Sequence, residues 1–168
     1  MMKRSSWTLS VLMTGIALAA LGADASAGQQ LKKFFLTIGE FTGSQATTAC
    51  PKGFHMASLW EILDPSNLVY DSAQGRTRDD AGSGPPSDSW GWIRTGGFPT
   101  SHSFVPGVDN CFDVDTISPW TSDSASETGT IVQLGTVWGP TAPVTVISPW
   151  VGDVLSCDAP TPVWCVEN

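Results

Sequence analysis

The segment Ala46-Thr-Thr-Ala-Cys-Pro-Lys-Gly-Phe-His-Met-Ala-Ser-Leu-Trp-Glu-Ile62 combines a cysteine, a glycine, a helix-start signal and an apolar run. Within it, Ser58 and Glu61 have the spacing of a capping box, in which the serine hydroxyl and the glutamate carboxylate satisfy free amides at a helix start. This spacing predicts a helix that begins at Leu59. The apolar residues around it are expected to face one core: Phe54, Met56, Leu59, Ile62 and Leu63.

The flanking segments predict further short elements. Residues 34–37 are aromatic and β-branched and predict a strand. Residues 45–50 predict a short helix capped by Ser44. The proline after Asp64 disfavours helical geometry, so the helix from Leu59 either ends there or Asp64 caps a second turn over residues 65–70.

A long polar segment follows. Residues 71–89 are rich in Asp, Ser, Gly, Pro and Arg, a composition typical of a solvated loop. Long loops in compact domains are often functional. The charged residues of this loop are expected to pair among themselves: Arg76, Arg78, Asp79 and Asp80.

The second half of the chain predicts short strands at residues 90–95, 130–137, 144–147 and 163–166, separated by turn signals. Helices near the start, strands later and long loops between them indicate an α+β fold. An all-β sandwich is the alternative.

Residues 1–27 have the features of a secretory signal peptide, with a positive start, an apolar core and a small-residue cleavage site. An uncleaved anchor is the alternative. No later stretch reaches eighteen consecutive apolar residues, so residues 28–168 are expected to form one soluble domain without a membrane span. We expect it in the periplasm, at the cell surface or outside the cell.

The charge balance limits the partners. The chain has 16 acidic and 8 basic residues, and its net charge of −8 becomes −9 without Lys3, Arg4 and Asp24 of the signal segment. Such acidity argues against nucleic acid or anionic lipid as a partner.

Four cysteines lie in residues 28–168: Cys50, Cys111, Cys157 and Cys165. They fit an oxidising compartment and allow three disulfide pairings. No two of them have C-x-x-C spacing, so disulfides are favoured over a zinc site.

The order of these landmarks resembles the C-type lectin-like domain, in particular its secreted bacterial branch without the calcium motifs. The first-helix cysteine with Gly53-Phe-His-Met-Ala-Ser58 is similar to the first-helix region of that family. Trp90-Gly-Trp-Ile-Arg-Thr-Gly96 stands at its tryptophan-isoleucine-glycine-leucine core strand, and residues 157–165 look like its closing cysteines. The resemblance covers most of residues 31–168.

This resemblance implies a fold and a pairing. The expected fold has two short helices near the N-terminus, small antiparallel sheets and long loops. The implied disulfides are nested, with Cys50 bonded to Cys165 and Cys111 bonded to Cys157, so that the ends of the domain are held together.

The sequence departs from the sugar-binding members of the family. They hold calcium with Glu-Pro-Asn or Gln-Pro-Asp and Trp-Asn-Asp triplets, and none of these occurs here. The 46-residue spacing from Cys111 to Cys157 is also longer than usual. Calcium-dependent sugar binding is therefore not carried over, and the resemblance implies a non-catalytic recognition or surface-structural module whose ligand is a protein or a glycan.

Two candidate sites remain for a lectin function. Oxygen ligands cluster at Asp109, Asn110, Asp113 and Asp115, and they suit calcium, although the EF-hand pattern is missing. A calcium-dependent lectin that uses these residues or Asp153 is one alternative, and an ordinary acidic loop is another.

Tryptophan can stack on sugars or anchor an interface. Trp60, Trp90, Trp92 and Trp164 are expected in the core, whereas Trp120 and Trp150 are expected to be exposed and to contact a ligand.

No catalytic residue is assigned. His55 and His102 are the only histidines, and no Gly-x-Ser-x-Gly elbow occurs. A hydrolase with an unrecognised site is the remaining alternative, because a Ser-His-Asp triad is defined by geometry and not by sequence order.

Overall fold

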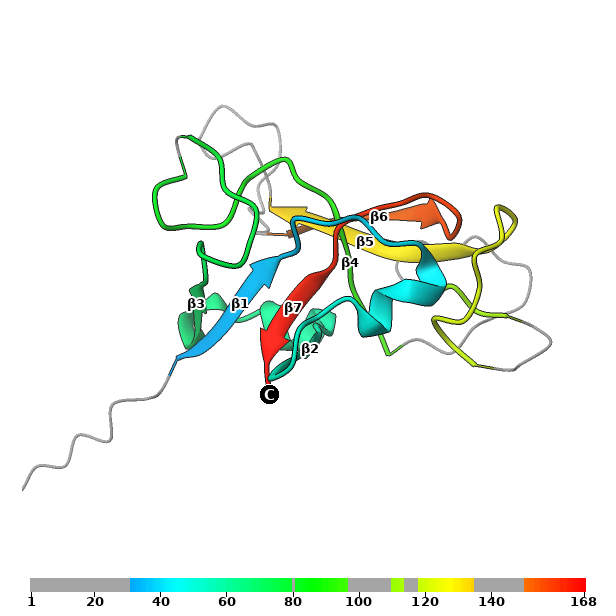
Figure 1. Ribbon diagram of the computed structural model, residues 1–168, viewed down its shortest axis with the longest axis horizontal. Helices are drawn as coiled ribbons and strands as arrows, with labels where there is room; N and C mark the ends of the chain where they lie inside the picture. The colour runs from blue at the N-terminus through cyan, green and yellow to red at the C-terminus, as the bar shows by residue number, and fades with distance from the viewer. Residues whose placement is uncertain (1–30, 80, 97–109, 114–117, 135–149) are drawn as a thin grey trace, which may run out of the picture.

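The computed structural model describes residues 31–79, 81–96, 110–113, 118–134 and 150–168 (Figure 1). Within them, two small sheets, short helices near the start and two disulfide bonds form an α+β fold, the class that the sequence predicted. The predicted signal peptide and the strand predicted over residues 144–147 lie outside the described residues.

The larger sheet has the strand order β2-β7-β1-β3. Its strands are β1 (Lys32–Leu36), β2 (Phe54–Met56), β3 (Leu68–Tyr70) and β7 (Trp164–Glu167). β7 pairs antiparallel with both β1 and β2, whereas β3 pairs parallel with β1. The sheet is therefore mixed, and the expectation of purely antiparallel sheets was wrong.

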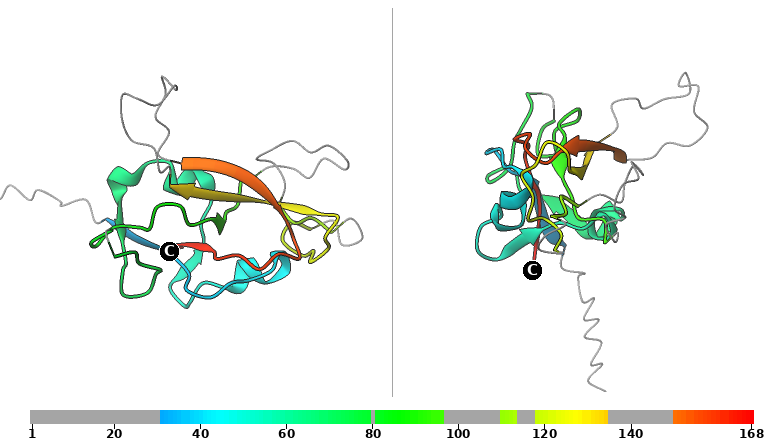
Figure 2. Two further views of the ribbon diagram at one scale, coloured as in Figure 1. Left: turned by 90° about the horizontal axis from the view of Figure 1, so that it is seen from above. Right: turned by 90° about the vertical axis from the view of Figure 1, so that its right-hand side faces the viewer.

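The smaller sheet is antiparallel and has the order β4-β5-β6. It consists of β4 (Gly91–Trp92), β5 (Thr128–Leu134) and β6 (Trp150–Ser156). Figure 2 shows the long β5 and β6 side by side, in a layer apart from β7. The sequence predicted β4 and β5 with shifted bounds but missed β6.

The helices are short, and two of the three begin where their predicted caps place them. The capping box places α1 at Leu59–Ile62, and the Ser58 backbone amide donates to the Glu61 carboxylate at 2.8 Å. The helix predicted over residues 45–50 is the 3₁₀ helix η1 (Gly43–Thr48), and the prediction of Ser44 as its cap was wrong: the cap is Thr42, whose backbone amide donates to the Gln45 side chain at 3.2 Å. Asp64 caps a second 3₁₀ turn, η2 (Pro65–Asn67), and the chain then becomes β3 instead of continuing the turn to residue 70.

The two ends of the described chain meet in the larger sheet. The backbone amide of Lys33 donates to the Glu167 carboxylate at 3.0 Å, and the Lys32 ammonium donates to the Glu167 carbonyl at 3.2 Å. The first and last strands, β1 and β7, are therefore neighbours in the sheet and hold the two ends of the described chain together.

Trp164 joins the two sheets. Its side chain is fully buried, and its indole N–H donates to the Val132 carbonyl of β5 at 3.0 Å. The ring stacks on Phe34 of β1 at 6.1 Å and meets Trp150 of β6 edge-on at 5.0 Å. Trp92 is equally buried, and its indole N–H donates to the Phe41 carbonyl at 2.8 Å.

Two disulfides connect distant segments. Cys50, beside η1, is bonded to Cys165 of β7 across 115 residues, and Cys111 is bonded to Cys157 across 46 residues. These are the two pairs that the resemblance implied.

The Cys111–Cys157 bond lies between two glycines. An added Cβ at Gly43 or Gly129 would stand 2.4 or 2.6 Å from the Cys111 sulfur. Non-bonded atoms do not approach this closely, so both positions must lack a side chain. The close approach of η1 and β5 to this disulfide therefore depends on glycine.

We expect the double variant Cys50→Ala, Cys165→Ala to lose about 4–5 kcal/mol of unfolding free energy. The disulfide closes a loop of 115 residues and so reduces the conformational entropy of the unfolded chain. The corresponding loss for Cys111→Ala, Cys157→Ala is about 4 kcal/mol. Denaturant unfolding under oxidising conditions measures both, and a loss below about 1 kcal/mol for the first variant would contradict the chain-entropy account.

We expect Gly129→Ala to destabilise the fold by about 1–3 kcal/mol, because the new methyl group meets the Cys111 sulfur and the Trp92 ring. Gly152→Ala on the neighbouring strand is the matched control, since a Cβ there has its nearest contact at 3.9 Å. Thermal unfolding of the two variants should separate them. Equal melting temperatures would show that the disulfide region can shift to accept the methyl group.

Candidate functional site

The structure describes part of the predicted metal cluster. Asn110 is buried, and its side-chain amide exchanges hydrogen bonds with Thr95 at 3.0 to 3.3 Å. Asp113 lies in an isolated bridge with Ser118, while Asp109 and Asp115 lie outside the described residues. Among the described residues, no group of three or more His, Cys, Asp or Glu side chains could hold a metal ion.

Asp153, the other candidate calcium ligand, is exposed on β6. Its carboxylate accepts the backbone amide of Val154 at 2.8 Å. His102, the second histidine, lies outside the described residues.

The prediction that Trp120 and Trp150 are exposed was wrong. Trp150 is 7% exposed, because its indole N–H donates to the Ile62 carbonyl at the end of α1 and its ring packs on Trp164. Trp120 is 4% exposed and packs edge-on against Trp92 at 5.8 Å. Both rings belong to the core, so neither can stack on a ligand in this conformation.

The prediction that Trp60 is buried was also wrong, since 73% of it is exposed. A four-residue helix buries one face, and in α1 that position is Ile62. Trp60 and Leu63 lie on the other face and are both exposed. The sequence did not show which face of the helix is buried, because the residues around the helix are mostly apolar and their spacing does not mark one face.

His55 is part of a polar network beside α1. Its Nε2 lies 2.8 Å from a Glu61 carboxylate oxygen, and its Nδ1 lies 2.7 Å from the Asn168 side-chain oxygen. The Ser58 hydroxyl donates to the same Glu61 carboxylate at 2.7 Å and not to the imidazole. The contact between nucleophile and base that a serine hydrolase needs is therefore not formed here.

The network favours the ionised form of Glu61. Partial burial raises the pKa of this carboxyl. The hydrogen bonds from the Ser58 amide and hydroxyl and from His55 together lower the pKa by more than burial raises it. The net result is a pKa below its usual value. Glu61 therefore stabilises the fold as a carboxylate.

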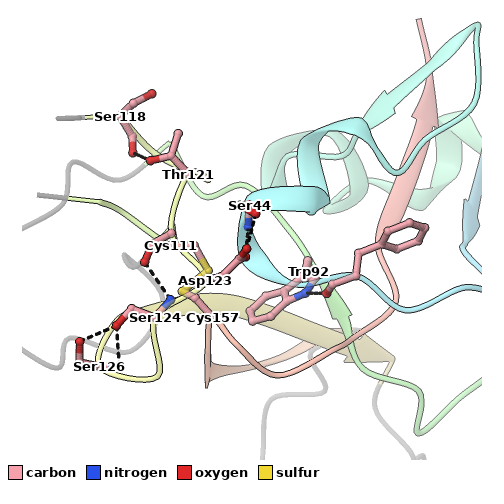
Figure 3. The surroundings of a disulfide bond; sticks show 11 residues. Ser44, Trp92, Cys111, Ser118, Thr121, Asp123, Ser124, Ser126 and Cys157 are labelled. Atoms are coloured by element: carbon pink, nitrogen blue, oxygen red, sulfur yellow. Dashed lines mark hydrogen bonds between the residues drawn. A yellow bond between two sulfur atoms is a disulfide. The ribbon is translucent and has the colours of Figure 1, made fainter. Parts of the chain in front are cut away.

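A second polar brace lies beside the Cys111–Cys157 bond (Figure 3). The Asp123 carboxylate accepts the Ser44 backbone amide at 2.8 Å and the Ser44 hydroxyl at 2.6 Å. Desolvation raises the pKa of Asp123, but the bonds from Ser44 and Thr42 outweigh it and hold the pKa below its usual value. This brace connects the start of η1 to the loop before β5.

An open pocket of about 460 Å³ lies where β1 ends, next to the loop of residues 71–89, which is green in Figure 1. We call it the Arg76 pocket. Its lining consists of Ile38, Gly75, Arg76, Thr77, Arg78, Pro86 and Ser89. Pockets of this size hold small ligands in many proteins.

Arg76 is fixed against the end of β1. Its guanidinium donates through Nε to the Thr37 carbonyl at 3.0 Å and through Nη2 to the Ile38 carbonyl at 3.0 Å. Nη2 also contacts the Glu40 carboxylate at 2.9 Å. The side chain is therefore held in one orientation and is still 30% exposed.

The backbone of this pocket wall is equally constrained. The Tyr70 hydroxyl donates to the Arg76 carbonyl at 2.6 Å, and the Arg76 amide donates to the Leu36 carbonyl at 2.8 Å. Burial raises the pKa of Tyr70 to about 12, so its hydroxyl remains a donor. At Gly75, an added Cβ would stand 2.5 Å from that hydroxyl oxygen, which explains why glycine occupies this position.

The second arginine of the pocket pairs within the loop, but not as predicted. Arg78 contacts the Asp88 carboxylate at 2.7 Å, and both side chains are more than half exposed. Arg76 uses Glu40, which lies outside the loop. The sequence therefore identified the loop and its arginines but not their partners, because Glu40 is distant in sequence.

Comparison with known proteins identifies no relative. No protein-family model, no curated protein and no solved structure matches this chain. In the described part of the chain, no helix is long and apolar enough to cross a membrane. The functional assignment therefore depends on the geometry given above.

We expect Glu61→Gln to lower the unfolding free energy by about 0.5–1.5 kcal/mol near neutral pH, because it weakens charge-assisted bonds to Ser58 and His55. The pKa of Glu61 is lowered in the folded state, so its contribution is present above the usual carboxyl pKa and is lost as pH falls below it. Unfolding of both proteins between pH 7 and pH 3 should show the difference shrinking. Asp158→Asn, at an exposed position, is the control, and a difference that persists at low pH would contradict the assignment.

Proposed function

We propose that this chain is a secreted, non-catalytic recognition module with a C-type lectin-like fold, whose ligand is a protein or a glycan. The observation that carries the proposal is the closure of β1 against β7 together with the Cys50–Cys165 bond beside it. The resemblance of the sequence to the C-type lectin-like domain implies the same disulfide between the two ends of the domain. The disulfides also support an oxidising compartment outside the cytoplasm.

The second disulfide supports the same proposal. Cys111 is bonded to Cys157, which directly follows β6, and the Cys111 sulfur packs against Gly43 of η1 and Gly129 of β5. A rigid, cross-linked scaffold suits recognition, because the binding groups are positioned before the ligand arrives.

The polar network beside α1 favours binding over catalysis. His55 is held between Glu61 and Asn168, and the Ser58 hydroxyl is directed to Glu61. These contacts stabilise a helix start, and they do not activate a nucleophile.

We expect the oxidised domain to bind its ligand without calcium. Thermal unfolding with millimolar calcium and then with chelator tests this, because calcium at about a hundred times its Kd would add about 2.7 kcal/mol to the stability of the folded state. We expect no shift in Tm. A clear upward shift would favour a calcium-dependent lectin and would direct attention to Asp113 and Asp153.

A ligand screen tests the recognition function itself. Purified protein is applied to a glycan array and to immobilised extracellular proteins in the presence of chelator, and parallel assays follow hydrolysis of generic ester, peptide and glycan substrates. We expect binding without turnover. Turnover that is lost in His55→Ala would overturn the proposal in favour of an enzyme, and the absence of any binding would overturn it as well.

A further inference from the structure

We propose that the Arg76 pocket binds the carboxylate or sulfate group of an acidic saccharide. The inference rests on the recognition function proposed above and adds a site and a ligand class to it. Three properties of the pocket carry it: the charge of its lining, the rigidity of Arg76, and the mixture of apolar and hydroxyl groups around the two arginines.

The pocket lining is cationic in a chain that is acidic overall. Residues 28–168 contain six basic residues, and two of them, Arg76 and Arg78, line this one pocket. Their partners Glu40 and Asp88 are not among the lining residues. A ligand in the pocket therefore meets the guanidinium groups directly, and an anion binds by sharing them with these two carboxylates.

Arg76 is positioned before a ligand arrives. Its contacts to the Thr37, Ile38 and Glu40 oxygens use Nε and Nη2, so the two Nη1 hydrogens take no part in them. The Tyr70 hydroxyl and the close packing at Gly75 hold the backbone beneath it. A guanidinium fixed in this way loses little conformational entropy when it binds an oxyanion.

The rest of the lining suits a sugar ring. Ile38 is 69% exposed and provides an apolar surface for the C–H groups of a pyranose, whereas Pro86 is fully buried. Thr77 is exposed and provides a hydroxyl that can donate to or accept from a sugar hydroxyl. The open pocket of about 460 Å³ has room for an anion that is attached to a larger polar body.

Arg78 is the residue to test first, because its side chain is 53% exposed and its ion pair with Asp88 lies at the surface. Isothermal titration of the oxidised protein is done with a galacturonate tetrasaccharide, a heparin tetrasaccharide, neutral maltotetraose and tetraglutamate. We expect one or both acidic saccharides to bind, and Arg78→Gln to weaken that binding about tenfold or more. Lys52→Gln removes the same charge from an exposed turn outside the pocket and should leave binding unchanged.

Asp88→Asn gives an opposite result that a structural role would not produce. It removes the carboxylate that competes for Arg78, so we expect acidic saccharides to bind several-fold more tightly. Asp88 has a φ of 58°, and asparagine tolerates this left-handed backbone, so the loop conformation should be kept. Weaker or unchanged binding in this variant would contradict direct recognition by Arg78.

The apolar part of the pocket is tested with Ile38→Ser, which should also weaken binding of the acidic saccharides. Val69→Ser on β3 replaces another exposed apolar side chain outside the pocket and is the matched control. Circular dichroism and Tm of all variants establish that they are folded.

The other outcomes separate this inference from the proposed function. Binding of tetraglutamate alone would replace the saccharide with an acidic peptide and overturn the ligand class. If acidic saccharides bind Arg78→Gln, Ile38→Ser and the wild type equally well, their site lies elsewhere and the inference is overturned. A screen that finds only neutral or protein ligands also overturns the inference. In both cases the proposed recognition function stands. No binding to any probe or screen would overturn both proposals.

Discussion

The buried indole of Trp164 is the contact on which the two sheets depend. Trp164 belongs to the last strand of the larger sheet, yet its N–H bonds to β5 and its ring packs on Trp150 of β6. Its other face meets Phe34 of β1, and it lies so close to Gly91 of β4 that a Cβ there would be 2.8 Å from the ring. One side chain thus contacts strands of both sheets. Because an indole buries a large area and carries a single donor, it can do this only where an acceptor is waiting.

Local chemistry explains how much of the fold could be predicted from the sequence. The capping box at Ser58 and the turn capped by Asp64 were predictable, because their partners lie two or three residues away. The parallel pairing of β3 with β1 was not, since a three-residue strand has too few residues to show a period. Strand β6 was missed for a related reason: Gly152 and Asp153 interrupt its apolar pattern, and its seven residues are held by pairing with β5.

The tryptophans show the limit of composition as a guide to exposure. Trp120 and Trp150 were expected to be accessible, but Trp150 donates to the carbonyl at the end of α1 and Trp120 packs on the ring of Trp92. Trp60 lies within an apolar run and is nevertheless exposed, because one turn of helix can bury one face only. Each outcome was decided by a partner that is distant in sequence. The same holds for the pocket, where Arg76 is recognisable in the loop but its fixed position depends on carbonyls of β1.

The charge of the chain restricts how the Arg76 pocket could select a ligand. A net charge of −9 over residues 28–168 repels an anion at long range, but this field is screened beyond about 10 Å at 0.1 M salt. Attraction by two guanidiniums, each already paired with a carboxylate, acts only at contact distance. Electrostatic steering therefore cannot supply the affinity, and the fit of the anion to Arg76 together with the ring contacts at Ile38 must do so. Such a site would discriminate by the shape and position of the anionic group more than by total ligand charge, because an additional charge outside the pocket makes no contact with Arg76 or Arg78.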